Sequence, residues 1–386
     1  MFVEREKGKR MAMKIVAIIE AGNIINQPPT ISLIENLLAN GNAVKLVSHG
    51  GEQLPSKIAW NKRFSYVPLV KVEDDSNLVI KFFSRLKAEH EVKEKTKMVM
   101  EQSDILWTTS VNTVRALQQD ILKYKNVFQL MELTQYGYTS RHTKFPLGEL
   151  ARKSWKNVVP EENRAYIEKA WWDLSKVPYI LPNKPYSLDY GKITEKMVQP
   201  LERMKNEKRK ILLYLGGIFP DRSLEAYAEA VCRNKEEYVL YIIGKAFDAK
   251  AQSRLDSIVK DYNAVYLGYF KAPKHLAFIQ YAYIGLLPYK TTHCFGLSDL
   301  NALYCAPNKI FEYAAFGIPM IGSNVLGLKN IFEKWDIGYC CNDDSSDELL
   351  DCIAKIDSNY EFMGKRCREY YESVDLDKIV QSIISD

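Results

Sequence analysis

The sequence predicts an α/β protein of two Rossmann-like domains that face each other across a cleft. Apolar, strand-like runs alternate with helix-like segments along nearly all of the 386 residues, which is typical of domains built on a parallel sheet. The alternation stops once, at residues 182–208, where three prolines and many charges replace the apolar pattern. A chain of this length can form two domains that each bury a core, so we expect one on either side of this interruption.

The N-terminal domain is expected to span residues 14–181. The preceding residues 1–13 are too charged for a signal peptide, and we expect them to form a disordered leader. The predicted strands of the domain lie at residues 14–19, 43–48, 104–109, 126–131 and 178–181, and the predicted helices at 30–40, 78–103, 111–122 and 162–173.

The C-terminal domain is expected to span residues 209–372, after an interdomain connection at 182–208. Its predicted strands lie at 211–215, 238–243, 264–267, 284–287 and 320–321, and its predicted helices at 223–232, 251–260 and 274–281, with a further short helix from residue 308 and helices that finish the chain. We expect residues 373–386 to form a C-terminal helix that packs back on the N-terminal domain.

Composition excludes several classes of protein. No apolar run approaches the length that crosses a bilayer. The seven cysteines all lie in the second half, their number is odd, and they form no Cys-x-x-Cys pair. This usage argues against a zinc site and against a disulfide framework, and reduced thiols in the cytoplasm are the simplest interpretation.

The charge is unevenly divided between the two halves. Residues 1–180 hold 27 Lys and Arg against 20 Asp and Glu, or +7, whereas residues 181–386 hold 26 against 28, or −2. The basic half is suited to an anionic membrane surface or an anionic acceptor. We do not expect nucleic-acid binding, because no compact basic cluster is interleaved with aromatic residues.

The segment at residues 307–323, Pro-Asn-Lys-Ile-Phe-Glu-Tyr-Ala-Ala-Phe-Gly-Ile-Pro-Met-Ile-Gly-Ser, is the most specific in the chain. Asn308 and Lys309 begin a short helix, and Gly317 ends it, followed by a proline and an apolar strand. Glu312 is the only acid of this helix, and a largely buried carboxylate is costly unless it is hydrogen-bonded. A ribose diol would supply two hydroxyl donors; the alternative is a glutamate that caps the helix or forms a salt bridge.

This segment resembles the nucleotide-binding helix of GT-B glycosyltransferases, above all the retaining family-four type (glycosyl transferases group 1). The pattern of that family is roughly Pro-x-Lys-x-x-Glu-Tyr-x-Ala-x-Gly-x-Pro followed by two hydrophobic residues, and every fixed position is filled here. The resemblance extends over nearly the whole chain in architecture and is specific in the C-terminal half. It implies the GT-B fold, a ribose held by Glu312, and a donor phosphate or sugar within reach of Asn308 and Lys309.

A diglycine follows the first strand of the second domain. Gly216 and Gly217 let the backbone approach a phosphate, and the helix expected from Ser223 offers free N–H groups. Arg222 adds a planar fork of donors. The resemblance implies that this loop contacts the donor diphosphate; the alternative is a tight turn with a surface arginine.

The next two strands also end at glycines, Gly244 and Gly268. In the resembling family, these strand ends flank the nucleotide base, which is read largely by backbone groups. Lys245 and Tyr269 are candidate side contacts, although each can equally be a plain loop residue.

The N-terminal domain matches the family less closely. Gly22 and Asn23 lie in the position of a glycine-rich loop after the first strand and are candidates to approach the acceptor or the donor phosphate. Many family members place a histidine after a later strand, where this chain has Glu132 as the nearest polar candidate, either for an acceptor hydroxyl or for fold stability. His49 and His142 lie at expected cleft-side loops, but a lone histidine is usually structural.

The chain departs from the family at the sugar site. Many members carry a further glutamate eight positions before the ribose-binding one, and that position is Tyr304 here. Residues 293–297, His-Cys-Phe-Gly-Leu, vaguely resemble the sequence that normally follows the missing glutamate, but they lie too far upstream. We therefore expect the loop between residues 288 and 308 to line the sugar pocket in a different way.

Residues 136–155 mix basic side chains with aromatic and aliphatic ones that the sequence suggests are exposed. This mixture suits a segment at a membrane interface. A loop folded over the acceptor cleft, with solvated charges, is the equal alternative.

The resemblance implies a cytoplasmic glycosyltransferase that moves a sugar from a nucleotide diphosphate sugar, UDP favoured, to a hydroxyl of a glycan or lipid-linked acceptor. A location at the inner face of the cell membrane is compatible with it. It implies a retaining mechanism and a role in cell-surface polysaccharide or glycoconjugate synthesis. The residues expected to serve catalysis are Glu132, Arg222 and Lys309, with no metal and no other cofactor. Two alternatives stay open: a nucleotide-sugar epimerase of the same fold, and a non-catalytic nucleotide-binding α/β protein.

Overall fold

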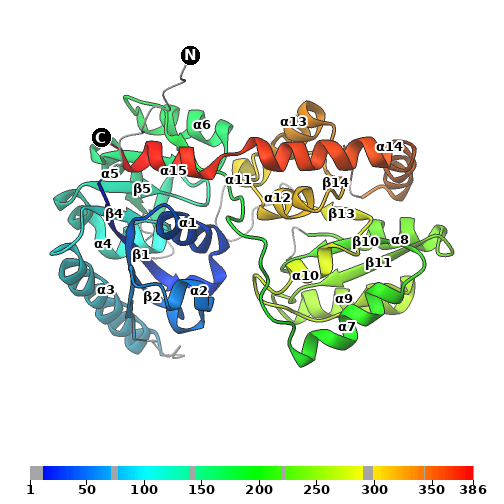
Figure 1. Ribbon diagram of the computed structural model, residues 1–386, viewed down its shortest axis with the longest axis horizontal. Coiled ribbons are helices and arrows are strands. Elements are labelled where there is room, and N and C mark those ends of the chain that lie inside the picture. Colours follow the sequence, from blue (N-terminus) through cyan, green and yellow to red (C-terminus); the bar gives the residue numbers. More distant parts are fainter. Residues whose placement is uncertain are drawn as a thin grey trace, which may run out of the picture.

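The computed structural model describes residues 12–70, 77–138, 144–219, 222–289, 299–342 and 344–385. It consists of two lobes side by side, each built on one parallel sheet, with the last helices of the chain running from one lobe to the other (Figure 1). The predicted pair of parallel α/β domains is confirmed.

The N-terminal domain contains a seven-stranded parallel sheet. Its strand order is β3-β2-β1-β4-β5-β8-β9, in which β1 lies between the second and fourth strands of the chain. This order is doubly wound, because successive crossovers run in opposite directions from β1. The strands are β1 (Ile15–Asn23), β2 (Ala43–His49), β3 (Phe64–Pro68), β4 (Ile105–Thr108), β5 (Asn126–Gln129), β8 (Lys156–Val159) and β9 (Tyr179–Ile180).

Helices cover both faces of this sheet, so its strands are apolar on both sides. One apolar cluster includes Val16 and Leu46, and the other includes Ala17 and Val47, which alternate with them along the same two strands. The helices are α1 (Pro28–Ala39), α2 (Ser56–Ala59), α3 (Leu78–Met100), α4 (Val111–Leu117), α5 (Leu147–Lys153) and α6 (Glu162–Trp172), and a small hairpin joins β6 (Tyr136–Tyr138) to β7 (Lys144–Pro146).

The C-terminal domain contains a six-stranded parallel sheet of order β12-β11-β10-β13-β14-β15. Its strands are β10 (Lys210–Leu215), β11 (Tyr238–Ile243), β12 (Val265–Tyr266), β13 (Ile284–Leu287), β14 (Met320–Ser323) and β15 (Gly338–Cys341). Its helices are α7 (Glu195–Asn206), α8 (Glu225–Arg233), α9 (Ala249–Tyr262), α10 (Leu276–Ile279), α11 (Asp299–Leu303), α12 (Asn308–Ala315), α13 (Leu326–Trp335) and α14 (Ser346–Ser373).

The segment expected to be an interdomain connection contains a helix of the second domain. Met197 and Met204 of α7 are buried in the same cluster as Ile211 of β10. The apolar positions of α7 are few and Pro200 lies within the helix, which explains why residues 195–206 looked like a linker. The extended chain between the lobes is therefore confined to residues 181–194.

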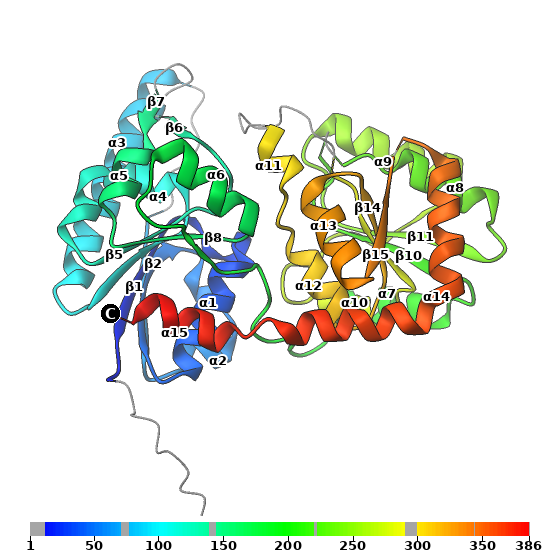
Figure 2. The same cartoon turned by 90° about the horizontal axis from the view of Figure 1, so that it is seen from above.

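The chain returns to the first domain at its end. After α14, helix α15 (Leu376–Ile384) packs against α1, and its Ile383 and Ile384 are buried in the N-terminal core. Asp377 accepts hydrogen bonds of 2.7 Å from the Nδ2 atoms of Asn36 and Asn40. Figure 2 shows α14 and α15 as one band along both lobes.

Candidate functional site

The carboxyl ends of the two sheets face each other. Lys271, after β12, donates a hydrogen bond of 3.3 Å to Gln53, which follows β2 in the other lobe. Farther along, the backbone N–H of Leu133, after β5, donates to the side-chain oxygen of Asn301 in α11 at 2.8 Å. Figure 2 shows α11 between the lobes. Ligands of open α/β sheets bind at this edge, so side chains there are the first candidates for function.

Helix α12 is fixed to the C-terminal sheet by Tyr313. This tyrosine is fully buried, and its hydroxyl donates a hydrogen bond of 2.8 Å to the carbonyl of Leu213 in β10. Its ring lies where a side chain at Gly285 of β13 would be, since a Cβ there would come within 2.5 Å of the ring. The glycine in the strand and the tyrosine in the helix therefore determine where the preceding residue, Glu312, points.

Glu312 is 5% exposed, and its carboxylate pairs with one identified partner. Nε2 of His275 lies 3.1 Å from Oε1 of Glu312. Burial raises the pKa of Glu312, but His275 and Lys309 lower it by more, so the net pKa lies below its ordinary value. The salt-bridge alternative is thus partly realised through Oε1, and no ion pair of the other carboxylate oxygen, Oε2, is found among the described residues.

Three glycines form the carboxyl edge of the sheet beside α12. Gly216 has φ +138° and Gly268 has φ +87°, conformations that other residues rarely adopt. The N–H of Gly244 donates to the carbonyl of Gly268 at 2.9 Å, and a Cβ at Gly244 would lie 1.7 Å from the carbonyl oxygen of Gly216. The backbones of three neighbouring strand ends are therefore in close contact here, with no room for a side chain at Gly244.

Two cations lie next to this glycine edge. The half-buried side chain of Lys309 runs over Gly216, whose Cβ would be 2.8 Å from Nζ. Burial lowers the pKa of Lys309, and the positive charge of Arg222 lowers it further. The two cations are therefore close enough to repel each other. The guanidinium of Arg222 lies 3.8 Å from the centroid of the Tyr289 ring. The predicted residues Gly216, Arg222, Lys309 and Glu312 are therefore brought together.

The diglycine loop differs from the expectation in one respect. Helix α8 begins at Glu225, two residues later than predicted, because the Glu225 carboxylate accepts hydrogen bonds from the hydroxyl of Ser223 and the N–H of Leu224. The N–H groups at this helix start are thus partly occupied. The carbonyl of Gly217 accepts a hydrogen bond of 2.6 Å from the Tyr214 hydroxyl, and the N–H groups of Gly216 and Ile218 donate to the carbonyls of Ile243 and Lys245 at 2.9 Å.

The remaining predicted nucleotide contacts lie at the rim. Lys245 is exposed, and Tyr269 is 51% exposed. Asn308 is half-buried at the first position of α12. The roles of these three residues stay predictions.

In the N-terminal domain, the first strand is longer than predicted. β1 continues through Asn23 with a register irregularity after Ile19, so Gly22 lies in the strand and not in a loop after it. The N–H of Gly22 donates to the carboxylate of Glu20 at 2.7 Å, and Thr109 donates to the same carboxylate at 2.7 Å. Glu20 is 1% exposed, and burial raises its pKa.

Sequence analysis did not select Glu20 as a site residue, although a lone acid directly after an apolar strand is a signal for one. It also did not select His275, whose partner is 37 positions away in the sequence, too far for any local pattern to indicate the pair.

Arg164 of α6 is a further residue that sequence analysis did not select. This arginine is 3% exposed and donates to the carbonyls of Tyr304 at 2.7 Å, Asn301 at 3.1 Å and Met131 at 2.8 Å. It thus joins the segment that replaces the family's sugar-binding glutamate to the end of β5 in the other lobe. Glu132 follows Met131 and is exposed beside this junction, and its catalytic role stays a prediction.

The described part of the segment at residues 136–155 includes apolar side chains that are buried. Phe145, Leu147 and Leu150 are at most 8% exposed and belong to the N-terminal core, which corrects the interfacial interpretation for these residues. Tyr136 is 40% exposed. His142 and the segment at 293–297 lie outside the described residues; His49 is the last residue of β2 and is half-buried.

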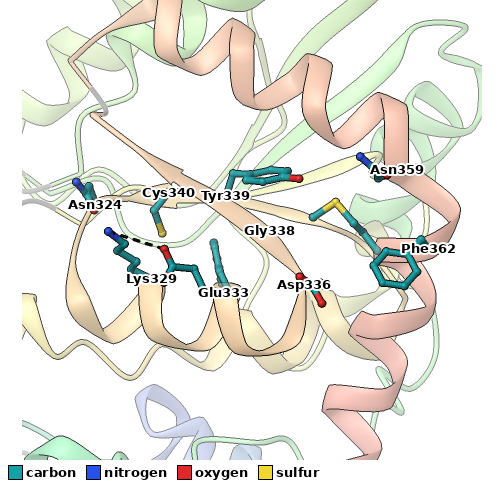
Figure 3. A pocket seen from close by; sticks show the side chains of 11 residues that line it. Asn324, Lys329, Glu333, Asp336, Gly338, Tyr339, Cys340, Asn359 and Phe362 are labelled. Carbon is teal, nitrogen blue, oxygen red and sulfur yellow. Dashed lines mark ion pairs between the residues drawn. The ribbon is translucent and has the colours of Figure 1, made fainter.

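A separate hollow of about 480 Å³ lies away from these residues (Figure 3). It is bounded by α13, by α14 near Asn359 and by the edge strand β15, and Lys329 and Glu333 form an ion pair of 3.8 Å across one side. None of the predicted site residues lines it, so it has no part in the site described above.

Within the described ranges, no three His, Cys, Asp or Glu side chains are grouped to hold a metal ion. Asp375 and Asp377 have Asp-x-Asp spacing, but Asp375 accepts from the N–H of Lys378 at the start of α15 and Asp377 binds α1. None of the helices in the described part of the chain combines the length and the apolar character that a membrane span needs.

Comparison with known proteins agrees with this geometry. Residues 199–373 match the family model described as Glycosyl transferases group 1. A search of curated protein sequences found no significant match.

Solved structures share the fold over nearly the whole chain. HepE from Anabaena, in complex with UDP and glucose, is 11% identical with a TM-score of 0.66 over 96% of this chain and 98% of that one. Sucrose-phosphate synthase from Thermosynechococcus elongatus is 14% identical with a TM-score of 0.68 over 96% and 97%. A putative UDP-N-acetylglucosamine 2-epimerase from Listeria monocytogenes is 12% identical with a TM-score of 0.57 over 93% and 91%. These likenesses show the GT-B fold.

Proposed function

Since the C-terminal domain belongs to the Glycosyl transferases group 1 family and the whole chain has the GT-B fold, we propose that this protein transfers a sugar from a nucleotide diphosphate sugar to a hydroxyl of a glycan or lipid-linked acceptor. The observation that carries the proposal is the buried carboxylate of Glu312 beside Lys309 and the glycine edge, at the strand ends that face the other domain. We favour UDP as the nucleotide, because HepE structures contain UDP or UDP-glucose.

In this proposal each part of the site meets a different part of the donor. Oε2 of Glu312 accepts from the ribose hydroxyls, while His275 holds the other carboxylate oxygen in place. Lys309 and Arg222 neutralise the diphosphate, since two cations in one field favour a doubly charged ligand. The main-chain groups around Gly244 and Gly268 lie against the base.

The proposed reaction retains the configuration of the transferred sugar. The leaving phosphate takes the proton of the acceptor hydroxyl on the same face of the sugar, so no strong general base is required from the chain. Lys309 and Arg222 stabilise the charge that develops on that phosphate. The proposal assigns no role to a metal, because Lys309 and Arg222 would supply the positive charge for the phosphates.

A nucleotide-sugar epimerase is the second candidate, and the likeness to the Listeria protein is the observation that favours it. An epimerase changes the sugar without an acceptor, and a binding protein changes nothing. Incubation with UDP-glucose, UDP-galactose, UDP-N-acetylglucosamine and GDP-mannose, followed by chromatography, separates the three functions.

We expect slow release of UDP from one UDP-sugar and no interconversion of sugars. Glu312→Ala should abolish the release, which excludes a contaminating hydrolase. Interconversion without UDP release would replace the transferase with the epimerase, and binding without turnover in the presence of glycan and lipid-linked acceptors would leave a binding protein. We further propose a cytoplasmic location at the inner face of the membrane and a role in cell-surface polysaccharide or glycoconjugate synthesis.

A further inference from the structure

Arg164 in α6 holds a segment of the other domain, residues 301–306. Its guanidinium donates to the carbonyls of Tyr304 at 2.7 Å and Asn301 at 3.1 Å, and to the carbonyl of Met131 in its own domain at 2.8 Å. Figure 2 shows α6 and α11 on the facing sides of the two lobes. The arginine is 3% exposed, so solvent does not compete for these bonds.

Two further hydrogen bonds fix the same segment from outside its own domain. The N–H of Leu133, after β5, donates to the side-chain oxygen of Asn301 at 2.8 Å. Nδ2 of Asn183, in the extended chain between the lobes, donates to the carbonyl of Ala306 at 2.8 Å. The segment is therefore bound at its first residue, at its last residue and at Tyr304 between them.

The segment also packs against the C-terminal domain. A Cβ at Gly327 of α13 would lie 2.7 Å from the backbone nitrogen and oxygen of Cys305, so the chain passes directly over this glycine. Burial raises the pKa of the Cys305 thiol to about 12, although the charges of Arg164 and Arg222 act against this rise. Residues 301–306 thus lie between one arginine of each domain.

The direction of α12 places the donor sugar beside this segment. In the proposed function, the ribose lies at Glu312 and the diphosphate at Lys309, which is closer to the start of α12. An α-helix rises about 1.5 Å per residue, so the donor runs toward the N-terminal end of α12 as it passes from ribose to phosphate. The sugar is attached beyond the diphosphate and therefore meets the residues that precede Asn308.

We propose that Arg164 is a positioning residue for the donor sugar. It holds residues 301–306 so that the sugar is recognised only with the support of the N-terminal domain, whereas the C-terminal domain alone binds the nucleotide. The nucleotide part is independent of Arg164, because Tyr313 fixes α12 to its own sheet. This inference rests on the proposed function, since it requires a nucleotide sugar as donor.

The test measures the affinity of the full chain for UDP, UDP-glucose, UDP-galactose, UDP-N-acetylglucosamine and GDP-mannose by isothermal titration. Arg164→Lys replaces the planar fork with a compact ammonium that cannot reproduce all three bonds. We expect the affinity for the donor, and the KM for UDP release, to worsen about tenfold or more. Asn183→Ala removes one uncharged bond and should weaken donor binding about two- to tenfold. UDP affinity should stay unchanged in both variants.

Asn157→Ala is the matched control for Asn183→Ala. Asn157 is also half-buried, and its Nδ2 donates one hydrogen bond of 3.0 Å to the carbonyl of Ala151 within the N-terminal domain. We expect this variant to bind UDP and the donor as the original chain does. Urea unfolding shows whether each variant is folded.

Three results would count against these assignments. Donor affinities of Arg164→Lys and Asn183→Ala equal to that of the original chain would overturn the inference and leave the proposed function intact. Equal losses of UDP and donor affinity would also overturn it, because both residues would then support the nucleotide site as a whole. Failure of the original chain to bind any of the sugar nucleotides would overturn the proposed function, and the inference with it.

Discussion

Replacement of Glu312 by alanine tests the assignment of the nucleotide site most directly. The variant removes the only carboxylate of α12, which is 5% exposed and held by His275 at 3.1 Å. A hydrogen bond to a charged group contributes about 1.5–3 kcal/mol, and each 1.4 kcal/mol or so changes an affinity about tenfold. One ribose hydroxyl on Oε2 thus accounts for a loss of about tenfold or more, and a second hydroxyl that shares the carboxylate raises the expected loss of UDP affinity to on the order of a hundredfold.

Isothermal titration with UDP measures this loss, and two further variants locate its cause. Glu312→Gln keeps the size of the side chain and removes its charge, so it should weaken UDP binding by about tenfold. Glu333→Ala removes a glutamate of α13 whose side chain is 68% exposed, and UDP affinity should stay unchanged. Urea unfolding of each variant separates lost affinity from lost stability.

The reasoning fails if Glu312→Ala is folded and binds UDP, GDP and other nucleotides as the original chain does. In that case the carboxylate serves only its ion pair with His275. A double variant with His275→Ala would then show a stability coupling between the two residues and no effect on nucleotides.

Further predictions concern other parts of the molecule. Sugar transfer should survive EDTA, and loss of activity that Mg²⁺ or Mn²⁺ restores would show that Lys309 and Arg222 do not suffice for the phosphates. Gly244→Ala should lower the free energy of unfolding by about 1–3 kcal/mol in urea titrations, because its Cβ would lie 1.7 Å from the carbonyl oxygen of Gly216; a variant as stable as the original chain would contradict this packing. Arg164→Met should cost about 3 kcal/mol or more, since three carbonyls lose a charged donor, whereas Arg152→Met loses one such bond and should cost less. The pKa of Glu312 is depressed in the folded chain, so the stability difference between the original chain and Glu312→Gln should shrink as the pH falls below 4.5.

The sequence predicts the parallel strands of both domains well where a strand is buried on both faces. β11 and β13 occur at the residues expected, because continuous apolar runs bounded by turn residues leave few other structures. Two of the edge strands, β3 and β15, were not predicted, whereas the edge strands β9 and β12 were. β3 is half-exposed, and β15 is a Gly-Tyr-Cys-Cys segment without a continuous apolar run, so their place in the sheet depends on neighbours distant in the sequence.

In the candidate site, too, residues with a local sequence signal were predicted and residues that depend on distant partners were not. Glu312, Lys309 and the glycine strand ends could be recognised locally, because one helix and three strand ends each carry their own signal. His275 and Arg164 could not, since their partners lie 37 and 140 positions away and only the fold brings them together. The interfacial interpretation of residues 136–155, one of two equal alternatives, was wrong for Phe145, because its apolar side chain is buried in the core.

The position of α15 has a consequence for synthesis on the ribosome. Residues 376–384 bury Val380, Ile383 and Ile384 in the core of the domain that is translated first. Lys184 fixes the segment that leads into α15, because its Nζ donates hydrogen bonds of 2.6 and 2.7 Å to the carbonyls of Tyr371 and Val374. Domains generally fold in the order in which they emerge, but here the first domain exposes an apolar groove along α1 until nearly the whole chain has been translated. Nascent chains arrested before residue 376 should therefore be cut by protease in the N-terminal lobe, and full-length chains should resist.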